Sequence, residues 1–336
     1  MTPTTDWESF AAGHRLISVF DTEVCDNNLG NAIIMDGVWR HLRGLFPDAF
    51  FMRLPYLDSI GREAQTYLRQ SHHVFFGGTN ALSSDMDTYR QWGVDRCNMD
   101  AVRDVVLMGV GWWQYQPPPT PATADLLRRT LSTHWLHAVR DSHTADMLRG
   151  IGIDNVLVTG CPSLWSFTDE DAALIPTAPA DLCVTTLTSY APDAARDRIL
   201  METLISRYRQ VLLWVQGSDD LAYARSLGLA GRVGIIRPSL ADYDAVLTSE
   251  EPLDYVGLRL HAGIRALCRR RRGLIIGIDN RAVEMGRDLG LPVLERSRID
   301  RLPEWLDHAP PCRIRVPQGA IDRWKAQFQN LAPSAS

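Results

Sequence analysis

Short apolar runs alternate with amphipathic stretches along most of the chain. In the first half, the apolar runs lie at 16–20, 49–54, 73–78, 105–111, 135–141 and 155–160. Between the first two runs, aliphatic residues recur at helical spacing until Pro47, namely Ile34, Val38, Leu42 and Leu45. Strands that alternate with helices form parallel sheets, so this rhythm predicts the α/β class.

The second half of the chain repeats this rhythm. Its strand-like runs lie at 182–187, 211–217, 233–238, 255–261 and 273–279, and a last amphipathic stretch at 321–332 predicts a helix. The simplest architecture with this pattern is two doubly wound, Rossmann-like domains that face each other across a cleft.

The length of the chain also favours two domains, because 336 residues exceed what one hydrophobic core usually holds. The segment 169–181 is rich in acidic residues, alanine and proline and lacks a clear period. We therefore predict an N-terminal domain over 1–172, a C-terminal domain over 178–316, and a terminal helix and tail over 317–336.

Composition excludes several classes of protein. A net charge of −5 gives no general attraction to nucleic acid. The six cysteines are scattered without a CxxC pair, which indicates reduced thiols and no metal framework. The chain shows neither a standard signal peptide nor an apolar stretch of about 18 residues, so we expect a cytoplasmic protein.

One residue type is almost missing from the sequence. Lys325 is the single lysine, and nearly all positive charge is carried by arginine. A P-loop lysine and a pyridoxal Schiff-base lysine are therefore effectively excluded. Any bound anion must be held by arginine or histidine.

Ligands of open α/β sheets bind beyond the carboxyl ends of the strands, so polar residues there are candidates. Asn28 and Asn31 follow the first strand, and Gly77, Gly78 and Thr79 end the third. Asparagine also favours ordinary capped turns, and a glycine pair is too short to be a dinucleotide fingerprint. Contact with a ligand and a purely structural turn remain open for both sites.

Arg140 and Asp141 stand where the fifth strand should end. They are candidates for substrate binding. An aspartate that caps the following helix, with the arginine paired to it, explains the same pattern equally well.

Arg259 and His261 are harder to explain by structure alone. Arg259 lies among residues that should be buried, and a buried arginine needs an anionic partner. His261 stands where a helix amino terminus offers free N–H groups. The pair predicts a carboxylate or phosphate site. The arginine run 269–272 falls at the end of the same helix and is interpreted as solvated charge that suits the helix dipole.

In its motifs, the chain resembles the polysaccharide pyruvyl transferase family from about residue 20 to 295. The motifs that carry the resemblance occur in order: NNLGN, FFGGTNAL, GVGWW, VRDSHTADMLRGIGI, VTGCPSLW, VGLRLHAGIRAL and IIGIDNRAVEMGRDLGLPVL. The resemblance implies an architecture similar to two-domain (GT-B-like) glycosyltransferases, with the acceptor on the N-terminal domain and the anionic donor on the C-terminal one.

The resemblance also implies a reaction. Such a transferase moves the enolpyruvyl skeleton of phosphoenolpyruvate onto a sugar as a cyclic ketal, in polysaccharide or glycoconjugate biosynthesis. Arg140 and Arg259 would clamp the donor from the two domains, and His261 would be the general acid or phosphate partner. Asp141 or Asp26 are candidates for the base. No metal or cofactor is implied beyond the donor itself.

Two other functions remain open. A glycosyltransferase with a nucleotide-sugar donor would need a similar anion site, and a non-catalytic sugar-binding protein of the same pathway would have an incomplete one. A further hypothesis is that Trp112, Trp113 and the proline loop after them contact a lipid-linked saccharide at the inner face of the membrane.

Overall fold

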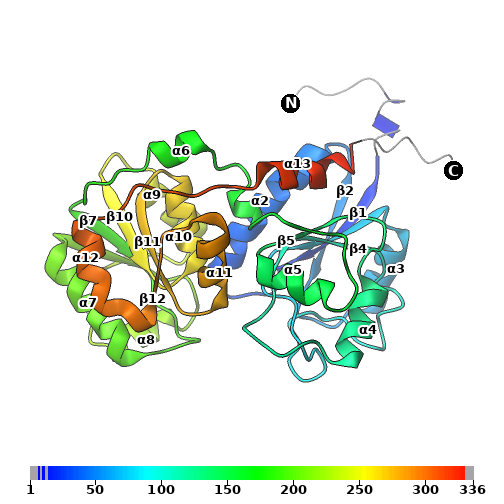
Figure 1. The fold of residues 1–336 in the computed structure, drawn as a ribbon, viewed down its shortest axis with the longest axis horizontal. Coiled ribbons are helices and arrows are strands. Elements are labelled where there is room, and N and C mark those ends of the chain that lie inside the picture. The colour runs from blue at the N-terminus through cyan, green and yellow to red at the C-terminus, as the bar shows by residue number, and fades with distance from the viewer. Residues whose placement is uncertain (1–6, 8–9, 12–13, 330–336) are drawn as a thin grey trace. The chain divides into compact units, whose positions relative to one another are not determined.

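The computed structural model describes Trp7, Phe10, Ala11 and residues 14–329, and it divides the chain into two units. The first unit comprises Met1–Cys25, Ile34–Trp165 and Pro317–Ser336, and the second comprises Asp26–Ile33 and Ser166–Val316. Each unit contains one six-stranded sheet (Figure 1).

The first sheet is parallel throughout and has the order β2-β1-β3-β4-β5-β6. Its strands are β1 (Leu16–Asp21), β2 (Phe50–Pro55), β3 (His73–Gly77), β4 (Val105–Val110), β5 (His137–Val139) and β6 (Val156–Val158). One face packs on α3 (Arg62–Gln70), α4 (Pro121–Thr130) and α5 (Ser142–Arg149). The opposite face packs on α2 (Leu29–Leu45) and α13 (Gln318–Ala326).

The second sheet is also parallel and has the order β12-β11-β10-β7-β8-β9. Its strands are β7 (Leu182–Thr185), β8 (Gln210–Trp214), β9 (Gly234–Ile236), β10 (Leu253–Gly257), β11 (Arg272–Gly277) and β12 (Val293–Glu295). One face packs on α7 (Ala194–Arg207), α8 (Asp220–Ser226), η2 (Arg296–Arg301) and α12 (Leu302–Asp307). The other packs on α9 (Leu240–Leu247), α10 (Leu260–Cys268) and α11 (Asn280–Leu289).

These layers confirm the predicted α/β class and the two doubly wound sheets. Alternate residues of one strand explain how both faces are covered: Phe75 of β3 contacts Trp324 of α13, while its neighbour Phe76 lies in the core under α3 and α4. The second sheet has the strand order of the Rossmann fold, with β7 and β10 as its first and fourth strands. Its topological switch point lies between these two.

The division of the chain differs from the predicted one. The second unit begins at Ser166, and it also takes in Asp26–Ile33 near the amino terminus. The predicted linker contains a short helix, α6 (Asp169–Ala173), closed by a capping box at Thr168. Helix α13 belongs to the first unit, because Trp324 is fully buried against the first sheet.

Two details of the predicted elements were wrong in the second unit. The strand expected over 255–261 ends at Gly257, and Arg259 is the N-cap residue of α10. The arginine run 269–272 is not a solvated helix end throughout, because Arg272 begins β11 and is buried beside Asp254. No helix in the described part of the chain is both long and apolar enough to span a membrane.

Candidate functional site

The candidate site lies at the switch point of the second sheet. Three strands that are neighbours in this sheet, β7, β10 and β11, end at the same edge. The loop after β7 carries Tyr190. After β10, Arg259 is the N-cap residue of α10 and His261 lies in its first turn, and after β11, Arg281 lies in the first turn of α11. The sheet order thus gathers residues that are far apart in sequence.

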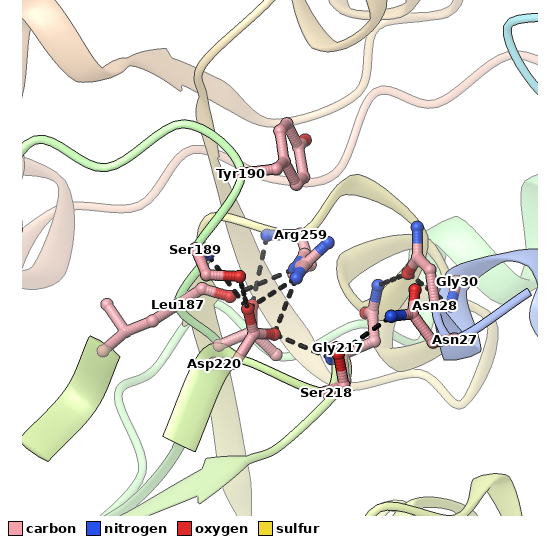
Figure 2. A network of polar contacts seen from close by, with 12 residues as sticks. Asn27, Asn28, Gly30, Leu187, Ser189, Tyr190, Gly217, Ser218, Asp220 and Arg259 are labelled. Atoms are coloured by element: carbon pink, nitrogen blue, oxygen red, sulfur yellow. Dashed lines mark hydrogen bonds and ion pairs between the residues drawn. The ribbon is translucent and has the colours of Figure 1, made fainter. Parts of the chain in front are cut away.

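Arg259 is almost completely buried, with 5% of its surface exposed, and its predicted anionic partner is a residue of the protein. Nη2 of Arg259 donates to both carboxylate oxygens of Asp220 at 2.7 Å, and Nε donates to the carbonyl of Leu187 at 3.1 Å (Figure 2). Among the described residues, none accepts a hydrogen bond from Nη1. One edge of the guanidinium is therefore anchored and one nitrogen is left for another acceptor.

Asp220 itself is fixed by several donors. It is fully buried and accepts from the backbone N–H of Ser189 at 3.0 Å and from that of Gly217 at 2.8 Å. Gly217 must be glycine, because a Cβ there would lie 2.6 Å from Nη2 of Arg259. The carboxylate thus holds the arginine at the end of β10.

The backbone of Arg259 is held by two buried hydroxyl groups. Its N–H donates to Thr186 Oγ1 at 3.1 Å, and its carbonyl accepts from the Tyr255 hydroxyl at 2.8 Å. Arg259 provides no side-chain cap for α10. The first turn of this helix therefore presents its amino end, with positive potential, beside an arginine.

A small pocket joins these groups. Its lining includes Arg259, His261, Tyr190, Arg281, Asp279, Gln216 and Asn28, all from the second unit. His261 is 6% exposed and lies in the first turn of α10. The structure thus brings Arg259, His261 and Asn28 together, as one anion site would require.

The turn after β1 reaches this pocket through Asn28. Its side-chain oxygen accepts from Gln216 Nε2 at 2.8 Å, and Asn27 donates to Ser218 at 2.8 Å (Figure 2). Asn31 instead donates to Asp26 at 3.0 Å and is not part of the pocket lining. Of the two predicted asparagines, only Asn28 therefore faces this pocket.

Arg281 is a residue of the site that sequence reasoning missed. Its Nε donates to Asp279 at 2.9 Å and its Nη2 donates to the Tyr190 hydroxyl at 2.6 Å. Burial alone would lower the pKa of Arg281, but the carboxylate of Asp279 and the Tyr190 hydroxyl outweigh it and raise the pKa. The group is therefore a permanent cation. Its place directly after a strand end was the signal available in the sequence.

Arg140 and Asp141 lie in the first unit, where the capping interpretation describes their geometry. Arg140 is 1% exposed, with Nε 2.9 Å from Asp141 and Nη1 2.5 Å from the Asn80 side-chain oxygen. Asp141 caps α5 by accepting from the Thr144 N–H at 2.8 Å. Nη2 of Arg140 is buried without a hydrogen-bond partner among the described residues, and the clamp with Arg259 stays a prediction.

The glycine pair after β3 is explained by packing on α2. A Cβ at Gly77 would lie 2.9 Å from the Met35 sulfur, and one at Gly78 would lie 2.1 Å from the Ile34 side chain. Gly78 and Thr79 both have left-handed backbone conformations. Close approach of a helix therefore accounts for the two glycines without a ligand, and substrate binding by Thr79 stays a prediction.

Of the two tryptophans predicted to contact a lipid-linked saccharide, only Trp113 has exposed surface. Trp112 is fully buried in the core of the first unit, so it has no surface to offer a membrane or an acceptor. Trp113 is partly exposed and stacks on Tyr89, with 3.8 Å between the ring centroids. Tyr115, close to it in sequence, is 58% exposed.

Within the described residues, no cluster of histidine, cysteine or carboxylate side chains forms a metal site.

Comparison with known proteins identifies the family of the chain. The family model for polysaccharide pyruvyl transferases matches residues 28–280, which include the pocket residues from Asn28 to Asp279, while Arg281 lies just beyond the matched range. The chain belongs to the polysaccharide pyruvyl transferase family. It is accordingly a transferase that modifies polysaccharides.

Several solved structures resemble this pyruvyl transferase family member distantly. The S. aureus MnaA–UDP complex is 12% identical, covers 95% of this chain and 91% of its own, and has a TM-score of 0.49. A UDP-GlcNAc 2-epimerase from Neisseria meningitidis is 12% identical, with 95% of each chain covered and a TM-score of 0.46. The E. coli heptosyltransferase WaaC is 11% identical. The match covers 86% of this chain and 99% of the heptosyltransferase, with a TM-score of 0.36. No curated protein matches the chain.

Proposed function

We propose that this family member uses phosphoenolpyruvate as its donor and transfers the enolpyruvyl skeleton to two hydroxyl groups of a sugar as a ketal. The observation that supports the proposal is Arg259 with Nη1 unused, beside His261 in an uncapped first helical turn. A guanidinium nitrogen, an imidazole and helix amides are donors suited to a phosphate or carboxylate.

The proposed reaction has three steps. A proton is added to the methylene carbon of the donor, and the resulting cationic carbon is attacked by one sugar hydroxyl, which loses its proton. Phosphate then leaves with the C–O bonding pair. The second hydroxyl attacks the same carbon and loses its proton, so that phosphate and one ketal are formed from one donor and two hydroxyl groups.

Several residues of the pocket suit individual steps of this reaction. Arg259 would hold an anionic group of the donor, and His261 would exchange the proton or contact the departing phosphate. Asn28 and Gln216 also line the pocket and would contact the ligand there. Asp141 is buried and engaged as a helix cap, which disfavours it as the base for the acceptor.

Phosphate release from phosphoenolpyruvate with a panel of sugar acceptors tests the proposal. Wild type should release phosphate, and the His261→Gln and Arg259→Lys variants should release much less. Arg259→Lys is preferred to Arg259→Ala because it keeps a positive charge beside buried Asp220. Thermal stabilisation by a nucleotide sugar and not by phosphoenolpyruvate would indicate a glycosyltransferase. Sugar binding without any donor binding would indicate a non-catalytic protein.

We propose a saccharide acceptor, lipid-linked at the inner membrane face, that contacts the exposed side chains after β4. Trp113 and Tyr115 present aromatic surface there, which suits stacking on sugars or an interfacial contact. Co-sedimentation with anionic vesicles should be weakened in Trp113→Ala. Absence of wild-type co-sedimentation would refute the membrane contact.

A further inference from the structure

A largely apolar cavity lies in the second unit, at the edge of the sheet opposite the pocket of Arg259. It is formed where β11 and β12 begin, whereas the pocket of Arg259 lies where β10 and β11 end. Leu267, Leu274, Val293 and Trp305 are among its lining residues. Its volume is about 280 Å³, which is room for about nine water molecules. Walls of this kind favour an apolar guest over water.

The two arginines that line this cavity differ in their environments. Arg272 is buried, pairs with Asp254, and donates from Nη1 to the carbonyl of Leu306 at 3.2 Å. Arg313 is exposed and forms no ion pair with a described residue. The inner wall is therefore neutralised by the protein, and the unpaired charge lies at the exposed side.

The cavity adjoins an open and more polar groove of about 890 Å³. Gly290, Cys312 and Arg313 line both the cavity and the groove. All lining residues of the two belong to the second unit. An apolar chamber and a polar surface thus meet at these three residues.

The groove offers more positive charge than the protein itself neutralises. Of its three arginines, Arg287 pairs with carboxylates of its own helix, α11. Arg313 and Arg315 are exposed, and neither forms an ion pair within the described part of the chain. Asp169, at the start of α6, is the one carboxylate of the lining outside α11. Two unpaired guanidinium groups against one carboxylate favour an anion.

We propose that the second unit binds a single-chain anionic amphiphile at this place. Its apolar chain fills the cavity, and its phosphate or carboxylate head binds Arg313 and Arg315 in the groove. The cavity has no room for the two long chains of a bilayer lipid, so the ligand is a free molecule with a short chain. Such a ligand leaves the pocket of Arg259 open, because the two places lie at opposite ends of β11.

Calorimetry with octyl phosphate, 1-octanol and inorganic phosphate separates the contribution of the chain from that of the head. Octyl phosphate, kept below its critical micelle concentration, should bind at least about tenfold more tightly than either of the other two. Hexyl phosphate should bind more weakly than octyl phosphate, by about fourfold for each methylene lost. Octyl phosphate that binds no more tightly than inorganic phosphate would overturn the inference.

The place of binding is tested at Cys312, which is partly buried where the cavity and the groove meet. Cys312→Trp should abolish binding of octyl phosphate, because the larger side chain closes the entrance to the cavity. Cys312→Ser is the matched control and should bind octyl phosphate like wild type. Equal Tm values of the two variants check that both are folded. Unchanged binding by Cys312→Trp would place the ligand elsewhere and overturn the inference.

The role of the arginines is tested without any change in the cavity. Arg313→Gln combined with Arg315→Gln should bind octyl phosphate about tenfold more weakly and 1-octanol like wild type. Arg237→Gln is the control, because its side chain is 83% exposed and lies outside the groove. Equal affinities of the double variant and wild type for octyl phosphate would refute the head site.

Vesicles of phosphatidylglycerol and phosphatidylcholine distinguish a free amphiphile from a membrane surface. Co-sedimentation with these vesicles, without any binding of octyl phosphate, would overturn the single-chain ligand. Binding of octyl phosphate that persists in the presence of saturating phosphoenolpyruvate is expected, because the two places are separate. Competition between the two ligands would overturn the inference and leave the proposed function intact.

Discussion

The Arg259 guanidinium is held by Asp220 through two hydrogen bonds of 2.7 Å, and both side chains are buried. The arginine that a donor would contact is thus neutralised by a carboxylate that no solvent reaches. The pair links the turn after β10 to the start of α8. Its role in stability and its role in binding must be separated in any mutational test.

Arg259→Met should lower the free energy of unfolding by about 3–5 kcal/mol, because it leaves the buried Asp220 charge uncompensated. Adding Asp220→Asn should recover part of this loss, since the charge is removed while an oxygen acceptor stays. Urea titration of the single and double variants measures both effects. Wild-type stability of Arg259→Met would show that the ion pair is not structural.

Gly111→Ala should destabilise the first unit by about 1–3 kcal/mol or more. A Cβ at Gly111 would lie 2.2 Å from Cζ of Arg140, so the guanidinium would have to leave Asp141 and Asn80. Gly44→Ala in α2 is the matched control, because nothing lies within 4 Å of its added Cβ. It should gain up to about 1 kcal/mol from helix propensity. Equal midpoints of urea unfolding for Gly111→Ala and Gly44→Ala would contradict the close packing of Gly111 on Arg140.

Arg272→Met should cost about 3–5 kcal/mol, whereas Arg270→Met should cost no more than about 1 kcal/mol. The two arginines are near neighbours in sequence but differ in environment. Arg272 is 3% exposed and its Nη2 lies 2.5 Å from Asp254, which also accepts from Tyr208 at 2.7 Å. Arg270 pairs with Asp171 and is half exposed. Thermal unfolding of Arg272→Met and Arg270→Met measures the difference. Similar Tm values for the two variants would refute the prediction.

Replacement of His73 should change the pH dependence of stability. Burial, followed by the charges of Arg15 and His72, lowers the pKa of His73 from 6.5 to about 4, and both ring nitrogens lack partners among the described residues. Below pH 6.5 the unfolded chain takes up a proton that the folded chain refuses until about pH 4, so stability is lost as the pH falls through this window.

His73→Leu removes this effect. Relative to wild type, the variant should gain about 2 kcal/mol more at pH 5 than at pH 7. Urea titrations at the two pH values measure the difference, with the exposed His134→Leu as control. A gain that does not depend on pH would contradict burial of a neutral ring.

His261→Gln should lower kcat by about 10²–10⁴ if the histidine transfers a proton. The affinity for phosphoenolpyruvate should change much less than in Arg259→Lys, because binding depends mainly on the arginines. Single-turnover phosphate release and calorimetry separate the two quantities. A large loss of affinity with unchanged turnover would assign His261 to binding instead.

Periodicity and chain order were sufficient for much of the fold. Apolar runs such as 73–78 and 105–111 are strands because residues buried on both faces of a parallel sheet must be apolar throughout. The end of such an apolar run also predicted the position of Arg259 and His261, and the presence of a single lysine limited the anion binders to arginine and histidine. These conclusions depend on local sequence, so no partner from elsewhere was needed.

Only the tertiary structure decided which residues meet. Asp220 follows β8 and Asn28 follows β1, and nothing in their neighbourhoods predicts contact with the turn after β10. The arginine run 269–272 has one composition but two environments, because the chain enters β11 at Arg272. Pairing across a sheet is set by strand order, which joins distant segments, and this is why Tyr190 and Arg281 became visible only in the folded protein.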